Sequence, residues 1–138
     1  MKFKYKDQIV AASSKSEAIR QITEDVFNRA EKGDLSILKL TNDVLSIKNK
    51  DGNTIIHLLA IYFSINAGKE IVKLPKELLL IKNKYGNNPI HLLAMNSSKE
   101  ILKLPKELLS IKNKKGQTPV EILNKRLSIN GTRPYYAT

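Results

Sequence analysis

Along the chain, short segments in which apolar and charged residues alternate are followed by segments in which apolar residues have helical spacing. In residues 81–87, IKNKYGN, apolar and charged side chains alternate briefly up to a glycine, which predicts a short extended segment and a turn. Residues 88–94, NPIHLLA, open with an N-cap acceptor and a proline at the first helical position, which predicts a short helix. A second helical piece begins at Glu100 and must end or restart at Pro105, because proline cannot continue a helix.

This unit of a turn and two helices occurs three times. The segment IKNKYGNNPIHLLA at 81–94 has a close copy, IKNKDGNTIIHLLA, at 47–60 and a more divergent one, IKNKKGQTPVEILN, at 111–124. Similarity at a period of about 30 residues is the signature of a repeat architecture. Because one unit cannot bury its apolar side alone, we expect the units to stack on one another.

The spacing of the units differs at one place. Leu104 follows Leu74 by 30 residues, whereas Leu74 follows Leu40 by 34 residues. The four additional residues lie between Ile61 and Lys73. We expect them to form an insertion in the loop between the two helices of that unit.

The two ends of the chain have patterns of their own. Apolar residues continue at helical spacing up to Gly33, which predicts one helix from about 15 to 32. Aromatic and lysine residues alternate within residues 1–13, which predicts a small β-hairpin laid against that helix. Apolar residues fall on one side of the last predicted helix, as a terminal repeat requires, and residues 129–138 are predicted to form a tail.

Two segments, Gly52–Ala60 and Gly86–Ala94, resemble the ankyrin repeat signature G-x-T-P-L-H-x-A. The resemblance extends over roughly residues 24–127, with departures such as Ile55 in place of proline and Glu121 in place of histidine. It implies a mainly α-helical fold, an ankyrin-type α-solenoid of helix-turn-helix repeats with β-turn fingers. The small N-terminal β-hairpin predicted from the alternation in residues 1–13 would precede it.

The pattern and the resemblance together divide the chain into six parts. They are a β-hairpin at 1–13, an N-terminal helix and capping repeat at 14–46, ankyrin repeats at 47–80 and 81–110, a C-terminal capping repeat at 111–128 and the tail at 129–138.

The composition of the chain bears on the cellular location of the protein. The 138 residues include no cysteine, which excludes disulfides and thiolate chemistry. The chain opens without the apolar run of a secretory signal peptide, and no stretch approaches the length of a membrane span. We therefore expect no membrane partner and a cytoplasmic location by default, although delivery into another cell by a specialised secretion system stays open.

Sequence motifs for catalysis are absent. The chain has no dinucleotide-binding, metalloprotease or serine-hydrolase motif, and we expect neither an enzyme, nor a cofactor, nor a small-molecule substrate. His57 and His91 occupy equivalent positions and would lie one above the other in a stack. A zinc site needs three or four ligands, and no third ligand has a suitable spacing. This argues against a metal site, and the resemblance to the ankyrin signature implies that both rings are structural and tie neighbouring turns together.

Positive charge is concentrated in the repeats. The net charge is +11, and residues 47–115 carry +8 of it, with lysines at the same positions of each turn. Such rows attract an acidic surface or a phosphate backbone, although a simple solvated face is an equal alternative. The turn-stabilising asparagines Asn49, Asn83 and Asn113 are expected to bond locally.

The candidate partner-binding residues lie at the turn tips and the ends of the first helices. They are Lys48, Lys50, Asp51, Asn53, Tyr62, Lys82, Lys84, Tyr85, Asn87, Met95, Asn96, Lys112, Lys114, Lys115 and Gln117.

Three functional hypotheses follow. The first is a non-catalytic protein-interaction module that binds a partner with an acidic surface, as an adaptor or an inhibitor. The resemblance implies that the contact is made through the concave face of turns and first helices. The alternative is a nucleic-acid-binding protein that uses the rows of lysines, although the repeats lack arginine and a series of stacking aromatic residues. The third is that the N-terminal hairpin offers an edge to a partner or to a second copy of the chain.

Overall fold

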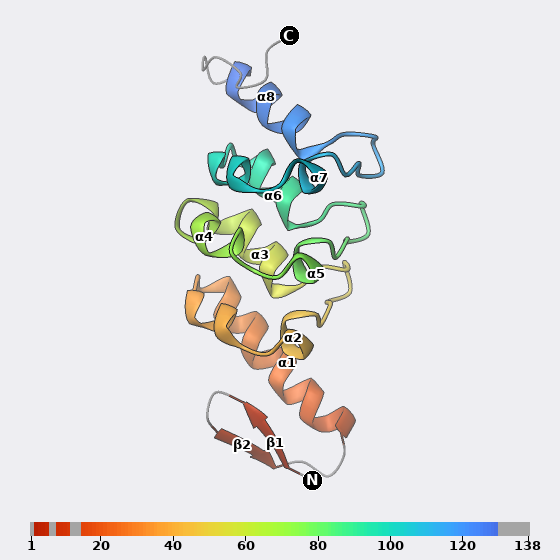
Figure 1. The fold of residues 1–138 in the computed structure, drawn as a ribbon. Helices are drawn as coiled ribbons and strands as arrows, with labels where there is room; N and C mark the ends of the chain where they lie inside the picture. Colours follow the sequence, from red (N-terminus) through yellow and green to blue (C-terminus); the bar gives the residue numbers. More distant parts are fainter. Residues whose placement is uncertain (1, 6–7, 12–14, 130–138) are drawn as a thin grey trace.

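The computed structural model describes residues 2–5, 8–11 and 15–129. Of the predicted tail at 129–138, Ile129 is instead the last residue of helix α8 (Pro119–Ile129), and residues 130–138 lie outside the described residues. The fold is mainly helical, as the sequence predicts (Figure 1). Helices stack in layers from the N-terminal to the C-terminal end, with α1 (Lys15–Glu31) packed on α3 (Ile55–Tyr62). In the same way α3 packs on α6 (Pro89–Met95), and α6 packs on α8 (Pro119–Ile129).

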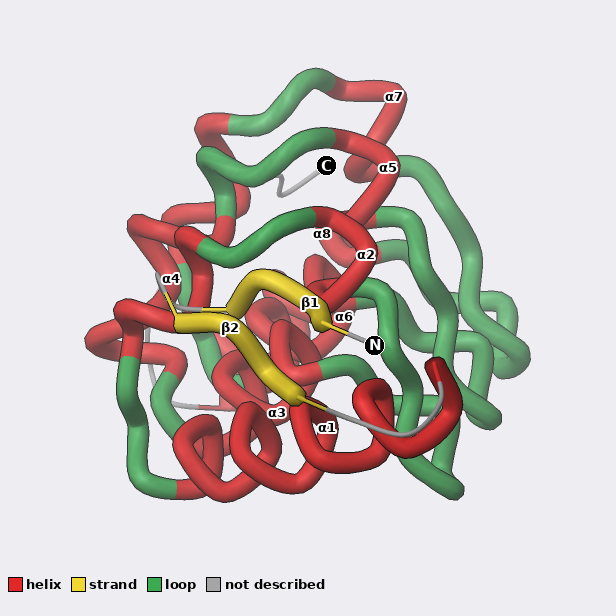
Figure 2. The backbone as a smooth tube through the Cα atoms, turned by 90° about the horizontal axis from the view of Figure 1, so that it is seen from below, coloured by secondary structure: helices red, strands yellow, loops and turns green. Residues whose placement is uncertain are grey.

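The layers of α1, α3 and α6 also have a second set of helical segments on their other side. Seen along the stack, these lie opposite α1 and α3 (Figure 2). They are the 3-10 helix η1 (Leu35–Lys39) with α2 (Asn42–Leu45), α4 (Ser64–Ile71) with α5 (Lys76–Leu79), and the 3-10 helix η2 (Lys99–Lys103) with α7 (Lys106–Leu109).

The insertion predicted for an inter-helix loop lies elsewhere. Only Phe63 separates α3 from α4, so the loop is not lengthened. The four additional residues lengthen the helices instead, since α4 has 8 residues where η2 of the next unit has 5, and α3 has 8 where α6 has 7. Repeat spacing gives the number of added residues but not the element that holds them, so the sequence alone did not distinguish a longer helix from a longer loop.

The core follows the repeat. Ile37, Ile71 and Ile101 occupy equivalent positions and are all fully buried. One continuous cluster of buried aliphatic residues connects α1 with α8 along the stack. The outer side of α8 is polar, with Glu121 exposed, while Leu123 is fully buried. Stacking therefore supplies the burial that no single unit could achieve.

The N-terminal residues include two short strands. Strand β1 (Lys2–Tyr5) pairs antiparallel with β2 (Gln8–Ala11), and Phe3 lies opposite Val10. Residues 6–7, where the turn of the predicted hairpin falls, are outside the described residues. Strand β1 contacts α1.

The turns that join the layers project to one side of the stack (Figure 1). We name them finger 1 (residues 47–53), finger 2 (81–87) and finger 3 (111–117). Each ends its tight turn with a glycine in the left-handed region, among them Gly86 at φ 74° and Gly116 at φ 76°. Finger 2 and finger 3 touch at this point, since a Cβ added to Gly86 would lie 2.7 Å from the backbone nitrogen of Lys114.

A pair of alanine substitutions separates backbone strain from finger packing. Gly86→Ala and Gly116→Ala both force alanine into left-handed backbone, at roughly 1–2 kcal/mol each. Only Gly86→Ala adds a clash, because a Cβ at Gly116 would meet nothing within 4 Å. We expect Gly86→Ala to lower the free energy of unfolding by about 1–3 kcal/mol more than Gly116→Ala in urea denaturation. Equal losses would contradict the close stacking of the fingers.

Candidate functional site

Each finger is built around one asparagine side chain. In finger 1, Asn49 Oδ1 accepts hydrogen bonds from the backbone N–H groups of Asp51 at 2.9 Å and Asn53 at 3.0 Å. Asn83 and Asn113 do the same in the other two fingers. The expected local role of these asparagines is confirmed.

The same asparagines also join one finger to the next. Asn83 Nδ2 donates to Asn53 Oδ1 at 2.9 Å, and Asn113 Nδ2 donates to Asn87 Oδ1 at 2.8 Å. The side-chain oxygens of Asn53 and Asn87 are therefore engaged between two fingers, and a contact of these residues with a partner stays a prediction. Asn87 is also buried, with 8% of its surface exposed. An aspartate at Asn83 would keep the local bonds and lose the bridge, since a carboxylate has no donor.

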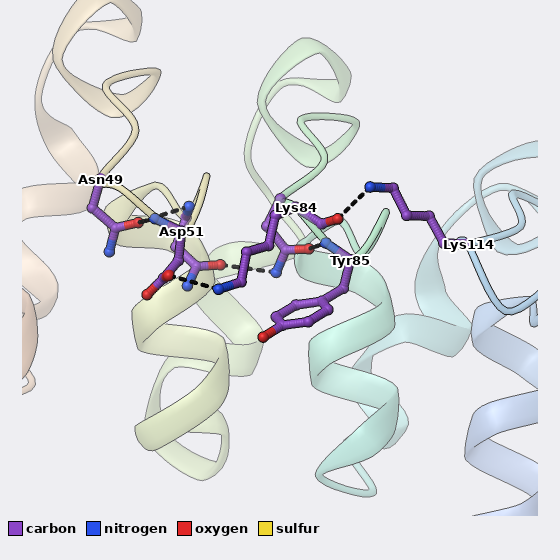
Figure 3. Close-up of polar contacts among 7 residues, drawn as sticks. Asn49, Asp51, Lys84, Tyr85 and Lys114 are labelled. Carbon is purple, nitrogen blue, oxygen red and sulfur yellow. Dashed lines mark hydrogen bonds and ion pairs between the residues drawn. The ribbon is translucent and has the colours of Figure 1, made fainter.

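The lysines of the fingers lie in rows, and several are engaged within the fold. Lys48 Nζ donates to the Lys82 carbonyl at 3.0 Å, and Lys82 Nζ donates to the Lys112 carbonyl at 3.2 Å. In the opposite direction, Lys114 Nζ donates to the Lys84 carbonyl, and Lys84 Nζ lies 2.9 Å from Asp51 Oδ1 (Figure 3). Each of these ammonium groups offsets the like charge beside it by reaching an oxygen of the neighbouring finger.

The ion pair between Lys84 and Asp51 shifts the pKa values of both residues. The hydrogen bond from Lys84 holds the pKa of the Asp51 carboxyl below its ordinary value, and the same bond raises the pKa of Lys84. Within the described residues, Lys50, Lys112 and Lys115 have no hydrogen-bonded or paired acceptor. None of these three ammonium groups is held by an oxygen of the described part of the fold, although the charge of Lys50 also contributes to lowering the pKa of Asp51.

Two aromatic candidates are exposed. Tyr85, at the tip of finger 2, has 59% of its surface exposed, and the Lys84 ammonium lies 5.1 Å from its ring centroid. Tyr62, at the end of α3, has 67% exposed. Met95, in contrast, is half-buried against the core, and Asn96 uses its Nδ2 to donate to the Ala60 carbonyl at 3.1 Å. Met95 and Asn96 thus have contacts within the fold, whereas both tyrosine side chains are accessible to solvent.

Both histidines tie one layer to the next finger, as expected. His57 Nδ1 accepts from the Thr54 N–H at 3.0 Å, and its Nε2 lies 3.1 Å from the Asn87 carbonyl, so Nε2 carries the proton. His91 makes the equivalent pair of contacts, to Asn88 and to the Ile111 carbonyl at 2.8 Å. Neither ring has a free lone pair for a metal. Burial lowers the pKa of His57 to about 4 and lowers that of His91 as well.

The last repeat explains why Glu121 replaces histidine. Glu121 Oε1 accepts from Thr118 Oγ1 at 2.9 Å and from the Thr118 N–H at 3.4 Å, which preserves the cap at the start of α8. Within the described residues no finger follows finger 3. A second ring nitrogen to reach such a finger is therefore unnecessary at this position.

An open groove of about 570 Å³ lies between α1, finger 1 and α3. Sequence reasoning missed it because it depends on how α1 sits beside the first finger. The signal that could have found it is the spacing of Glu24, Phe27 and Glu31, which places them on one face of α1. The lining residues include Glu24, Phe27, Asn28, Glu31, Asn49, Asp51, Asn53, Leu58, Ile61 and Tyr62.

No group of three His, Asp or Glu side chains in the described part of the chain is placed to hold a metal ion. None of the described helices has both the length and the apolar character that a membrane crossing requires. Neither known protein-family models nor curated protein sequences match this chain.

The bridging amides can be tested by aspartate substitution. Asn83→Asp removes the donor to Asn53 Oδ1 and places a charge beside it, so the free energy of unfolding should fall by about 1–3 kcal/mol. Asn49→Asp is the matched control, because Asn49 Nδ2 has no acceptor among the described residues. It should change stability by less than about 0.5 kcal/mol in urea denaturation. A similar cost for both variants would refute the bridge.

The buried histidines predict a pH dependence of stability. In the unfolded chain His57 titrates near its ordinary pKa of 6.5, whereas in the fold it does so at about 4. Between pH 6.5 and about pH 4, His57 is protonated in the unfolded chain but stays neutral in the fold. The contribution of His57 to the free energy of unfolding is therefore largest above pH 6.5. It should fall as pH decreases, by up to about 1.4 kcal/mol per pH unit for one such ring.

Urea denaturation between about pH 7 and pH 5 measures this slope. The variant His57→Gln does not titrate and should be less stable at neutral pH, with a shallower dependence that reflects His91. Stability of the unaltered protein that stays flat across this range would show that the rings are not held neutral.

Proposed function

We propose that this chain is a non-catalytic, ankyrin-type repeat module that binds a partner protein and acts as an adaptor or an inhibitor. The proposal takes the architecture to be an ankyrin-type α-solenoid with β-turn fingers and an N-terminal hairpin. Its main support is one observation: the fingers are fixed to each other by buried amide and imidazole contacts, while Tyr62 and Tyr85 beside them are exposed.

A rigid surface suits a binding role. The fingers are ordered by their own contacts before any partner arrives, so little conformational entropy is lost on association. Tyrosine side chains provide large contact area with few rotatable bonds and are enriched at interfaces. Tyr85 and Tyr62 are therefore the expected anchors.

The charge at the C-terminal fingers indicates the chemistry of the partner. Lys112 and Lys115 of finger 3 are exposed, and neither ammonium has an acceptor among the described residues. An acidic protein surface would be attracted to them and would associate faster than a neutral one. Nucleic acid is the alternative partner for these lysines, and the exposed edge of the N-terminal strands is a third contact.

The test is a pull-down from nuclease-treated lysate with Lys112→Glu/Lys115→Glu. Its control, Lys76→Glu/Lys106→Glu, makes the same charge change on α5 and α7, away from the fingers. We expect one protein to be retained by the unaltered chain and the control and to be lost with the finger variant, because the acidic contact becomes repulsive.

Retained material is identified by mass spectrometry, and circular dichroism checks that both variants fold. A protein retained equally by all three forms would contradict the finger contact. Binding that disappears on nuclease treatment, and that falls steeply with salt beforehand, would favour nucleic acid instead.

A further inference from the structure

The first finger lacks a neighbour that the other two fingers have. In finger 2, the Lys84 N–H donates to the Asp51 carbonyl at 3.1 Å, and in finger 3 the Lys114 N–H donates to the Tyr85 carbonyl at 3.3 Å. Asn83 and Asn113 add the bridging side-chain bonds described above. Each of these two fingers therefore receives acceptor atoms from the finger before it.

The equivalent donors of finger 1 are Asn49 Nδ2 and the Lys50 N–H. Neither reaches an acceptor within the described residues. The layer before finger 1 contributes α1, a continuous helix from Lys15 to Glu31, where the later layers contribute a finger and a shorter helix. The groove of about 570 Å³ lies between α1 and finger 1, and Asn49 lines it.

The groove has the opposite charge to the rest of the protein. Its lining includes three carboxylates, those of Glu24, Glu31 and Asp51, and no lysine or arginine. Lys50 stands between the lining residues Asn49 and Asp51 in the chain but is not itself one of them. Asp51 is paired with Lys84. Glu24 and Glu31 are exposed and have no ionic partner among the described residues. In a chain of net charge +11, two unpaired acids facing one hollow favour a positively charged occupant.

The floor and the rim of the groove are partly apolar. Phe27 lies between Glu24 and Glu31 on the groove side of α1, and Leu58 and Tyr62 line it from α3. Tyr62 is two-thirds exposed, with 67% of its surface accessible. The combination offers an aromatic and aliphatic contact between two carboxylates.

We propose that this groove binds an extended or turn-forming peptide segment of a partner protein that carries lysine or arginine beside an aliphatic or aromatic residue. The inference rests on the proposed binding function and names the ligand chemistry at its N-terminal end. The peptide's carbonyls accept from the Lys50 N–H and Asn49 Nδ2, as a preceding finger would. Its basic side chain pairs with Glu24 or Glu31, and its apolar side chain packs on Phe27 and Tyr62.

Two other occupants fit less well. An acidic segment would be repelled by the groove carboxylates. A second copy of this chain, at +11, would be opposed by the net charge of both molecules. A basic peptide satisfies the open donors, the carboxylates and the apolar rim together.

The experiment selects a random peptide library displayed on phage against the immobilised full chain. Selection runs in parallel on three further forms: Glu24→Lys/Glu31→Lys, Tyr62→Ala, and the control Glu77→Lys/Glu107→Lys. The control reverses two exposed acids on α5 and α7, outside the groove. Circular dichroism and sedimentation confirm that every form is folded and report its mass.

We expect enriched peptides that place lysine or arginine next to an aliphatic or aromatic residue. Synthetic versions should bind Glu24→Lys/Glu31→Lys at least about tenfold more weakly than the unaltered chain, lose affinity for Tyr62→Ala, and bind the control equally well. Amide NMR shifts of Asn49 and Lys50 on peptide addition would place the ligand in the groove.

Three results overturn the inference. The first is enrichment of acidic peptides that bind the finger 3 variant Lys112→Glu/Lys115→Glu more weakly than the unaltered chain. This result would agree with the proposed function and contradict a basic ligand. No enrichment, or basic peptides that bind all forms equally, would remove the groove as a site. A dimer of the unaltered chain that is lost only in Glu24→Lys/Glu31→Lys would make a second copy the occupant instead.

Discussion

The structure depends on the contact between one finger and the next. A finger is a loop of exposed backbone, and its carbonyl and N–H groups need partners if successive layers are to pack closely. The Asn83 and Asn113 side chains meet this need twice over, by closing their own turn and by donating to the preceding finger. The histidine of each inner layer fixes the next finger from the helix side. The helices and the fingers are therefore held to each other as they stack, so that both follow the same order of layers.

This constraint also changes the meaning of the lysine rows. Aligned like charges repel, and an ammonium group left beside another lowers stability. Lys48 and Lys82 instead reach forward to carbonyls of the next finger, and Lys84 and Lys114 reach back. A lysine in this position therefore has a structural use as well as a charge. The lysines free for a partner are fewer than the sequence suggests.

Where the pattern of contacts ends, unsatisfied groups remain. At the C-terminal end, Glu121 replaces histidine, and finger 3 exposes Lys112 and Lys115. At the N-terminal end, finger 1 keeps open donors beside an acidic and aromatic groove. The two ends therefore differ in charge, and a partner that spans the fingers would match a basic and an acidic region in turn. Such a pattern selects against partners of uniform charge.

The sequence by itself determined the mainly helical fold, the helix after residue 14 and the proline-limited second helices, because these depend on local spacing and on backbone chemistry near each residue. It also determined that the histidines are structural. Only the tertiary structure decided that the extra residues lengthen α3 and α4, that Asn53 and Asn87 are bridges, and that α1 leaves a groove beside finger 1. The bridges join atoms 30 and 26 residues apart in the chain, the groove lies between α1, finger 1 and α3, and α4 packs on η1, α6 and η2. Such contacts arise only once layers stack.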